Sequence, residues 1–269
     1  MSSPGLQFFA EIAKVQEQIL LPIFVKLGRL QEQLWIDIGV ESTENLDPGF
    51  LETYKRCRDH TLTSFKAMYA MYQAASYVTK AAIPGDYVEC GVWKGGSSMI
   101  AALAFRHAGN TDRKLYLYDT YEGMPNLGNE DADLGTGQFQ LLMNLSTGLR
   151  GGHAGVFYAS LEEVRRNMQS TGYPEEKICL VKGMVEHTLP AQAPDQISLL
   201  HLDSDLYQST YHELTHLYPR LSKGGVLIID DYGSWKGSRK ATGQYFQEHE
   251  ISMLLTPIGS DGAHMGIKP

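Results

Sequence analysis

Acidic residues follow apolar runs at four places in the chain, and they are the side chains best suited to chemistry. The runs are nearly continuous in apolar residues, which is typical of strands buried on both faces of a parallel sheet. Ligands bind an open parallel sheet at the carboxyl ends of its strands, so these acids are expected to line one binding edge. The six acids are Glu89, Asp119, Asp203, Asp205, Asp230 and Asp231.

Three of these acids predict a metal site. The strands over 197–205 and 226–231 would be neighbours across one helix, which would bring Asp203, Asp230 and Asp231 together. Carboxylates that close repel one another unless a cation lies between them. Oxygen-only ligands select a hard ion, Mg²⁺ or else Mn²⁺ or Ca²⁺, rather than zinc. The alternative is that these residues only cap a turn and a helix.

Residues 86–105 predict a strand, a glycine turn and a helix, the unit with which doubly wound α/β sheets bind nucleotides. Gly91 is followed by Gly95 and Gly96, unlike the dinucleotide pattern G-x-G-x-x-G, and Glu89 precedes the turn. A pyrophosphate prefers bare amide donors without a nearby carboxylate. S-adenosylmethionine (SAM) has a sulfonium, an ammonium and a ribose but no phosphate, and it suits an acid here. The alternative is a helix-start turn without a ligand.

Two further strand ends would complete the cofactor site. Asp119 follows the strand over 114–119, at the position where an acid commonly accepts hydrogen bonds from the ribose hydroxyls. Its alternative role is to form the turn that follows. Gly183 and Val185 come after the strand over 177–183 and would lie beside the adenine on topological grounds alone.

These strands belong to a predicted α/β fold. Two short strands near Leu254 and Met265 would bring the sheet to seven mostly parallel strands, with helices on both faces. The helices are expected over 64–82, 97–105, 161–170, 211–221 and 237–249. Residues 39–60 are polar and read as irregular, with a turn at Asp47-Pro48-Gly49.

Two segments are predicted to lie outside this sheet. Apolar residues at helical spacing over 6–38, interrupted by Pro22, indicate an N-terminal arm that packs or forms an oligomer. Residues 124–157 are rich in glycine and proline and indicate a lid insertion. The predicted division is an arm or lid over 1–60 and a catalytic domain over 61–269.

Composition excludes several classes of protein. The formal net charge of −8 over 269 residues argues against a nucleic-acid binder, and no apolar run is long enough for a membrane span. The three cysteines are scattered and form neither a disulfide framework nor a CxxC pair. We therefore expect a cytoplasmic protein.

Taken together, the motifs resemble the macrocin-type (TylF-like) O-methyltransferases. They are residues 87–97 (YVECGVWKGGS), 118–125 (YDTYEGMP), 164–167 (VRRN), 188–190 (TLP), 201–207 (HLDSDLY) and 224–232 (GGVLIIDDY). The resemblance covers about residues 60–269, and Tyr121 and Lys94 depart mildly from the common pattern. It implies a Rossmann-like class I methyltransferase that uses SAM and Mg²⁺ to methylate a hydroxyl of a deoxysugar on a secondary metabolite.

The resemblance also assigns roles. Asp203, Asp230 and Asp231 match the metal ligands, and Asp205 matches the proposed general base, with His201 as a rival base. The partner would be a small sugar-bearing acceptor, and a homo-oligomer is expected from the N-terminal helices. The expected cofactor-binding residues are Glu89, Cys90, Gly91, Val92, Ser97, Asp119, Gly183 and Val185.

Three other classes of protein remain as alternatives. The D-x-D at Asp203 and Asp205 suits a haloacid-dehalogenase-type phosphatase, but in that family this strand lies near the N-terminus. An NAD-linked oxidoreductase is disfavoured by Glu89 and by the glycine spacing. A non-catalytic SAM-binding protein would keep the same fold.

Overall fold

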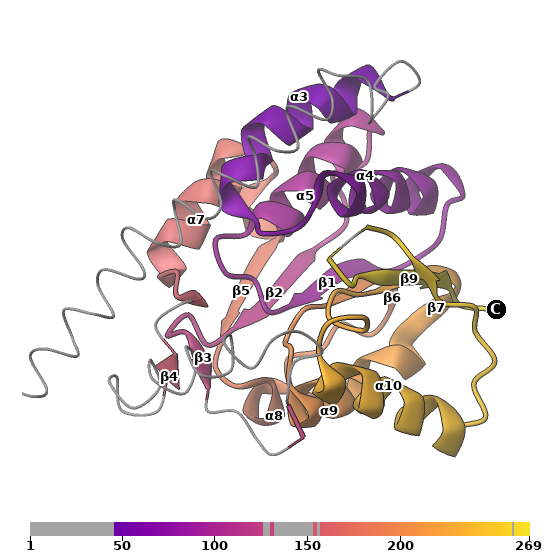
Figure 1. Cartoon of the computed structure of the whole chain (residues 1–269). Coiled ribbons are helices and arrows are strands. Elements are labelled where there is room, and N and C mark those ends of the chain that lie inside the picture. The colour runs from indigo at the N-terminus through magenta and orange to yellow at the C-terminus, as the bar shows by residue number, and fades with distance from the viewer. Residues whose placement is uncertain (1–45, 126–129, 132–152, 155–156, 260) are drawn as a thin grey trace, which may run out of the picture.

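The computed structural model describes residues 46–125, 130–131, 153–154, 157–259 and 261–269, and a seven-stranded sheet runs through them (Figure 1). The order is β5-β2-β1-β6-β7-β9-β8, in which β5 to β7 are parallel and β9 and β8 are antiparallel. The strands are β1 (Asp86–Cys90), β2 (Leu115–Asp119), β5 (Ile178–Lys182), β6 (Ile197–Leu202), β7 (Leu221–Ile229), β8 (Thr256–Pro257) and β9 (His264–Ile267). The predicted mostly parallel seven-stranded sheet is confirmed. A separate pair joins β3 (Met124–Pro125) to β4 (His153–Ala154).

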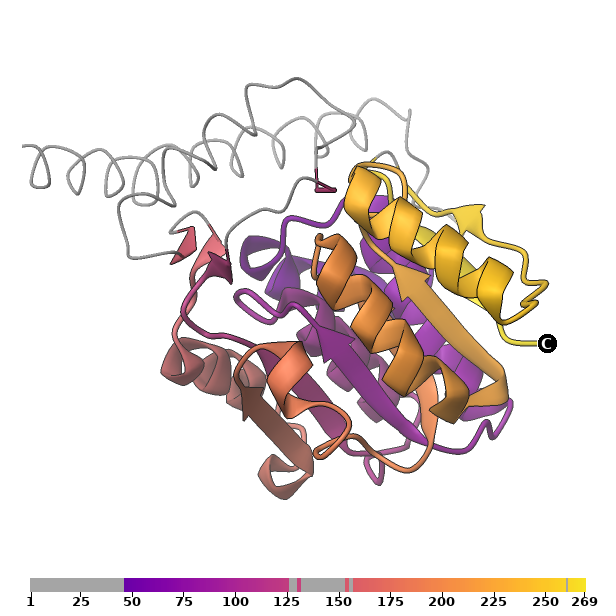
Figure 2. The same ribbon diagram turned by 90° about the horizontal axis from the view of Figure 1, so that it is seen from below.

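Helices cover both faces of the sheet. In Figure 1, α3, α4, α5 and α7 lie above it and α8, α9 and α10 lie below it, and Figure 2 views the second group from its own side. The helices are α3 (Pro48–Cys57), α4 (Phe65–Lys80), α5 (Gly96–His107), α7 (Leu161–Ser170), α8 (Val185–Thr188), α9 (Tyr207–Leu217) and α10 (Lys236–Glu248). Short 3₁₀ turns are η2 (Arg58–His60), η4 (Glu175–Lys177) and η5 (Tyr218–Arg220).

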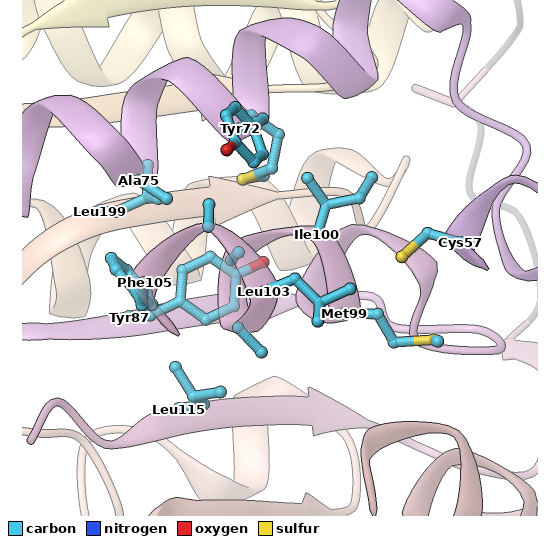
Figure 3. Close-up of a cluster of buried hydrophobic side chains, with 14 of the residues drawn as sticks. Cys57, Tyr72, Ala75, Tyr87, Met99, Ile100, Leu103, Phe105, Leu115 and Leu199 are labelled. Atoms are coloured by element: carbon cyan, nitrogen blue, oxygen red, sulfur yellow. The ribbon is translucent and has the colours of Figure 1, made fainter. Parts of the chain in front are cut away.

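Alternation along the strands divides the interior into two hydrophobic layers. Tyr87 of β1 faces α5, where its ring meets Phe105 edge-on with centroids 6.4 Å apart (Figure 3). Val88, the next residue, lies in the opposite layer with Leu200 and Leu227. Successive strand residues point to opposite faces, so every central strand contributes to both layers. Packing on both faces therefore fixes the positions of the central strands, and with them the loops that follow their carboxyl ends.

Residues 48–57 form a helix, so the prediction of irregular structure there was wrong. The carboxylate of Asp47 accepts a hydrogen bond from the Gly49 amide at 2.8 Å, and Pro48 is the first helical residue. Proline is favoured at that position because its missing N–H would have no helical partner. Asp-Pro-Gly therefore begins α3 instead of making a turn. Phe50 and Cys57 of α3 are buried in the same layer as α4 and α5, so the predicted boundary at residue 60 falls inside one core.

The strand limits also differ from the predicted ones. β6 ends at Leu202 and β7 at Ile229, so the acids at 203, 205, 230 and 231 lie in the loops just beyond the sheet. β7 begins at Leu221, five residues before its predicted start at residue 226, and includes Gly224 and Gly225. α9 begins at Tyr207, four residues before its predicted start. Two of them stay tied to the neighbouring strands, because the Asp203 amide donates to the Cys90 carbonyl at 2.8 Å and the Asp230 amide donates to the Leu202 carbonyl at 2.9 Å.

Two predictions fall mainly outside the described residues. The helical pattern predicted over 6–38 lies wholly outside them, as do residues 1–45 of the predicted 1–60 arm and most of the insertion over 124–157. Within the part of the chain that is described, no helix has the length and apolar character needed to cross a bilayer.

Candidate active site

One cavity of about 370 Å³ lies at the carboxyl ends of the parallel strands. Its wall includes loops after β1, β2, β5, β6 and β7, which is the edge expected for ligand binding in such a sheet. The predicted site residues that line it are Glu89, Gly91, Val92, Ser97, Asp119, Gly183, Val185, Asp203, Asp205, Asp230 and Asp231. The cofactor and metal predictions therefore fall on a single cavity.

Asp119 organises the glycine turn. One carboxylate oxygen accepts hydrogen bonds from the amides of Val92 (2.8 Å) and Trp93 (3.1 Å), and the other accepts from Tyr121 (2.7 Å). Burial raises the pKa of Asp119, and these amide bonds oppose the rise. A carboxylate has about four acceptor positions, and the Thr120 hydroxyl occupies the fourth only weakly, at 3.4 Å, so a ligand hydroxyl would replace that long contact. It both shapes the turn and faces the cavity.

Gly91 is required by the close approach of β1 and β6. Its φ is +81°, and a Cβ atom there would lie 1.9 Å from the carbonyl oxygen of Asp203. Only glycine combines that backbone conformation with such an approach. The glycine turn and the loop that carries Asp203 are therefore in direct contact.

Glu89 is buried at the base of the cavity. It is 1% exposed, accepts a short hydrogen bond from the Ser98 hydroxyl and lies 3.0 Å from Nδ1 of His201. His201 is 2% exposed, and its other ring nitrogen lies 3.6 Å from a carboxylate oxygen of Asp230. Burial alone lowers the pKa of His201, but Asp230 and Glu89 outweigh it and raise the pKa to about 9. The imidazole thus lies between two acids.

The three predicted metal ligands converge. Carboxylate oxygens of Asp203, Asp230 and Asp231 all lie within 4.8 Å of one another. Burial raises the pKa of Asp203 well above its ordinary value, and the charges of Asp230 and Asp231 raise it further. Burial raises the pKa of Asp231 as well, with added repulsion from Asp205 and Asp230. Two of these crowded acids, Asp203 and Asp231, thus resist ionisation, and a bound cation would relieve the repulsion.

Asp205 is held beside this cluster in an uncommon conformation. Its φ is +64°, in the left-handed region, and its amide donates to a carboxylate oxygen of Asp231 at 3.0 Å. Such conformations in non-glycine residues concentrate at functional sites. Burial raises the pKa of Asp205 to about 7, although a hydrogen bond with Asp231 lowers it in part.

The residues present suit a hard divalent cation and a nucleoside with a cationic tail. The acidic cluster offers oxygen ligands only, which is the preference of Mg²⁺, Mn²⁺ and Ca²⁺. The neighbouring half of the cavity has the acids Glu89 and Asp119 and the apolar residues Val92 and Val185, and no lysine or arginine of the described residues lines it. That wall favours a ligand without phosphates.

Cys90 lies apart from the other predicted site residues. It is fully buried in the layer beneath α9 and does not line the cavity. The reason is strand alternation, since Glu89 points toward the cavity side and its neighbour must point away. The placement leaves Cys90 in the core, where burial raises its thiol pKa well above the ordinary value.

Several lining residues were missed at the sequence level. The linker between η2 and α4, residues 60–63, lines the cavity. It lies against the start of α5, because a Cβ atom added at Gly96 would be 2.5 Å from the carbonyl oxygen of His60. Asp261, in the turn between β8 and β9, accepts a hydrogen bond from the Ser64 amide at 2.7 Å and faces the cavity. The only sequence signal for Asp261 is an acid between Gly259 and Gly262, in the segment that joins the two predicted strands near Leu254 and Met265.

Most of this chain matches a known protein family. Residues 55–265 match the macrocin O-methyltransferase (TylF) family. Demethyldecarbamoylnovobiocin O-methyltransferase of Streptomyces niveus is 33% identical over 205 residues, which is 76% of this chain and 74% of that protein. The 8-demethyl-8-(2,3-dimethoxy-alpha-L-rhamnosyl)-tetracenomycin-C 4'-O-methyltransferase of Streptomyces olivaceus is 34% identical over 203 residues, again 76% of this chain and 74% of that protein.

Solved structures agree with the assignment. The O-methyltransferase NovP superposes with a TM-score of 0.67 at 30% identity and covers 81% of this chain and 87% of its own. The calicheamicin methyltransferase CalS11 gives 0.59 at 19% identity, over 84% of this chain and 98% of its own, which supports the fold. Neither the phosphatase nor the oxidoreductase alternative accounts for these matches. The chain therefore belongs to the macrocin O-methyltransferase family and is a SAM-dependent O-methyltransferase.

Proposed function

We propose that this enzyme methylates a hydroxyl of a sugar carried by a natural product and that it needs a divalent cation such as Mg²⁺. The observation that carries the proposal is one cavity with a glycine turn on one side and three converging carboxylates on the other. The names of the Streptomyces relatives, which include novobiocin and tetracenomycin derivatives, support an acceptor of this class.

The chain offers a separate set of residues for each ligand. Asp203, Asp230 and Asp231 would hold the cation. Glu89 and Asp119 would face the cationic and hydroxyl groups of SAM, with Gly91 and Ser97 beside them. When bound, SAM supplies the methyl group, and the cation lowers the pKa of the acceptor hydroxyl and orients it. Positioning the oxygen behind the methyl carbon, in line with the sulfur, can lower the barrier by about 7–11 kcal/mol.

Asp205 would act as the general base. Its carboxylate would accept the hydroxyl proton of the acceptor, while bound SAM would supply the methyl group and keep the electron pair of the broken carbon–sulfur bond on its sulfur. A base works best with a pKa near the working pH. The pKa of Asp205, raised by burial to about 7, meets that condition.

The location of His201 argues against it as the base. Its Nδ1 faces Glu89 and its Nε2 faces Asp230, and only 2% of the residue is exposed. An imidazole engaged by acids on both nitrogens has no lone pair turned toward an acceptor in the cavity. The general base is therefore assigned to Asp205.

The test compares two isosteric variants with the same acceptor. Asp205→Asn should lower kcat by about 100-fold or more while the affinities for SAM and Mg²⁺ stay within a few-fold of wild type. The matched control Asp195→Asn, at an exposed position before β6, should leave all three quantities unchanged. Retained turnover in Asp205→Asn would remove Asp205 from the mechanism.

A ligand screen tests the rest of the proposal. Thermal shift with SAM, NAD and phosphate esters, each with and without Mg²⁺, should give stabilisation by SAM. Turnover is then measured on a panel of glycosylated natural products and their aglycones. Methylation of the aglycone instead of the sugar would contradict the proposed acceptor. Binding of SAM without turnover on any acceptor would favour the non-catalytic alternative.

A further inference from the structure

A buried chain of polar side chains joins the two halves of the cavity. The Ser98 hydroxyl at the start of α5 donates to one oxygen of Glu89, and the other oxygen of Glu89 lies 3.0 Å from Nδ1 of His201. Nε2 of His201 then lies 3.6 Å from Asp230. The chain thus runs from the wall expected to face SAM to the carboxylates expected to hold the cation.

Strand pairing in the sheet places Glu89, His201 and Asp230 next to one another. Glu89 of β1 is directly opposite His201 of β6, and Leu202 and Ile229 pair one step further on, so that Asp230 follows at the end of β7. The amide of Asp230 donates to the carbonyl of Leu202 at 2.9 Å, which ties the start of the acidic loop to β6. Glu89 and His201 therefore lie at one level, and Asp230 lies two positions beyond Ile228, the residue of β7 that pairs with His201.

Burial restricts the movement of the side chains in this polar chain. Ser98 is fully buried, Glu89 is 1% exposed and His201 is 2% exposed, while the Asp230 side chain is 18% exposed toward the cavity. Tightly packed interiors transmit small displacements because neighbouring side chains cannot adjust independently. A change in the position of Asp230 must therefore be felt by the imidazole and, through it, by Glu89.

We propose that His201 is a positioning residue that couples the cation site to the SAM site, so that each ligand raises the affinity for the other. The inference rests on the proposed function, since it takes Asp230 as a cation ligand and Glu89 as a contact of SAM. A cation draws Asp230 into one orientation, which fixes the imidazole and holds Glu89 ready for the cofactor. Coupling of this kind is reciprocal and is commonly between about 5- and 150-fold.

The first measurement uses the wild-type enzyme. The Kd of S-adenosylhomocysteine is measured by calorimetry with and without saturating Mg²⁺, and the Kd of Mn²⁺ is measured by electron paramagnetic resonance with and without S-adenosylhomocysteine. We expect both affinities to rise by about fivefold or more, and by the same factor. Equal affinities with and without the second ligand would overturn the proposal. Failure to bind S-adenosylhomocysteine or Mn²⁺ at all would instead remove the proposed function.

Two variants each retain one of the two polar contacts of the His201 imidazole. His201→Asn retains a donor near the Nδ1 position, toward Glu89, and His201→Gln retains one near the Nε2 position, toward Asp230. His201→Asn should keep the metal-free affinity for S-adenosylhomocysteine within about threefold, and His201→Gln should keep the affinity for Mn²⁺ alone within the same limit. In both variants the coupling factor should fall below about twofold. A coupling factor that stays at the wild-type value in both variants would refute the assignment.

The control variant is Ser198→Ala on the same strand. Ser198 is fully buried and bonds to Arg113 and to the Asp86 carbonyl at the opposite end of β6, away from both ligands. It should lower Tm without changing the coupling factor, and loss of coupling there would indicate a general packing effect. If the His201 variants do not fold, ¹⁵N-histidine NMR of the wild-type enzyme tests the proposed coupling instead. The ring nitrogens of His201 should shift on adding Mg²⁺ alone and on adding S-adenosylhomocysteine alone, and no shift with either ligand contradicts the proposal.

Discussion

Asp203→Asn is expected to stabilise the metal-free enzyme and to destabilise the metal-bound one. Asp203 lies within 4.8 Å of Asp230 and Asp231, and no side-chain hydrogen bond is recorded for it among the described residues. The substitution keeps the volume, removes one charge and provides an amide that can donate to the remaining carboxylates. Without a cation it relieves repulsion, whereas with a cation it removes a ligand.

The expected size follows from the distances. Two unit charges 4.8 Å apart repel by about 3.5 kcal/mol at an effective dielectric constant of about 20. Proton uptake limits the penalty to about 4 kcal/mol per carboxyl at pH 7, because protonating an ordinary aspartate costs about 1.4 kcal/mol per pH unit above its pKa of about 3.9. After solvent screening we expect a gain of about 2 kcal/mol, which raises Tm by about 4–8 °C in a domain of this size.

The assay is thermal unfolding of both proteins in EDTA and in saturating Mg²⁺. At 100 times its Kd the cation stabilises the wild type by about 2.7 kcal/mol, and the variant should gain far less, so the order of the two Tm values reverses. The exposed control Asp195→Asn should follow the wild type in both buffers. A metal-free Tm of Asp203→Asn below that of the wild type would refute the argument from repulsion.

The remaining predictions concern pH, the glycine turn and the cation. Because burial raises the pKa of Asp205 to about 7, the folded metal-free enzyme binds more protons than the unfolded chain, so its free energy of unfolding should increase as pH falls from about 7 toward 4; a decrease would contradict this. Gly91→Ala should cost more than about 2 kcal/mol, whereas Gly109→Ala, with φ +75° and open space, should cost only about 1 kcal/mol, as measured by urea unfolding. Asp119→Asn should weaken SAM binding about tenfold or more by calorimetry, because an amide cannot accept from all three backbone N–H groups. Chelation by EDTA should abolish turnover while far-UV circular dichroism stays unchanged, and added Mg²⁺ should restore it; activity that persists in EDTA would argue against the cation.

The sequence predicted those features that depend on interactions between residues close together along the chain. Apolar runs predicted the central strands, and the helix predicted over 161–170 has the observed bounds of α7. Side chains alternate between the two faces of a strand, so a cofactor role for both Glu89 and Cys90 was inconsistent with the predicted strand. The helix over 48–57 was missed because Asp-Pro-Gly suits both a turn and a helix start, and only the burial of Phe50 and Cys57 against α5 decides between them.

Residues 212–216 (HELTH) show what local pattern cannot decide. They match the H-E-x-x-H pattern of zinc peptidases, in which the two histidines bind zinc and the glutamate is the general base. In the structure Glu213 is fully buried and accepts a hydrogen bond from the Ser204 hydroxyl at 3.1 Å. Among the described side chains, no group of three possible metal ligands includes His212 or His216. The glutamate supports the loop of Asp203 and Asp205 instead.

The sequence alone determined the fold class, the positions of the acids after the strands and the family resemblance, since each depends on neighbours along the chain. Only the tertiary structure decided that three carboxylates lie within 4.8 Å, that Asp261 joins the cavity and that His201 lies between Glu89 and Asp230. Those relations depend on which strands are adjacent and where each one ends. Pairing of β1, β6 and β7 is a property of the whole packed sheet, because residues more than a hundred positions apart must be buried together before any of these distances exists.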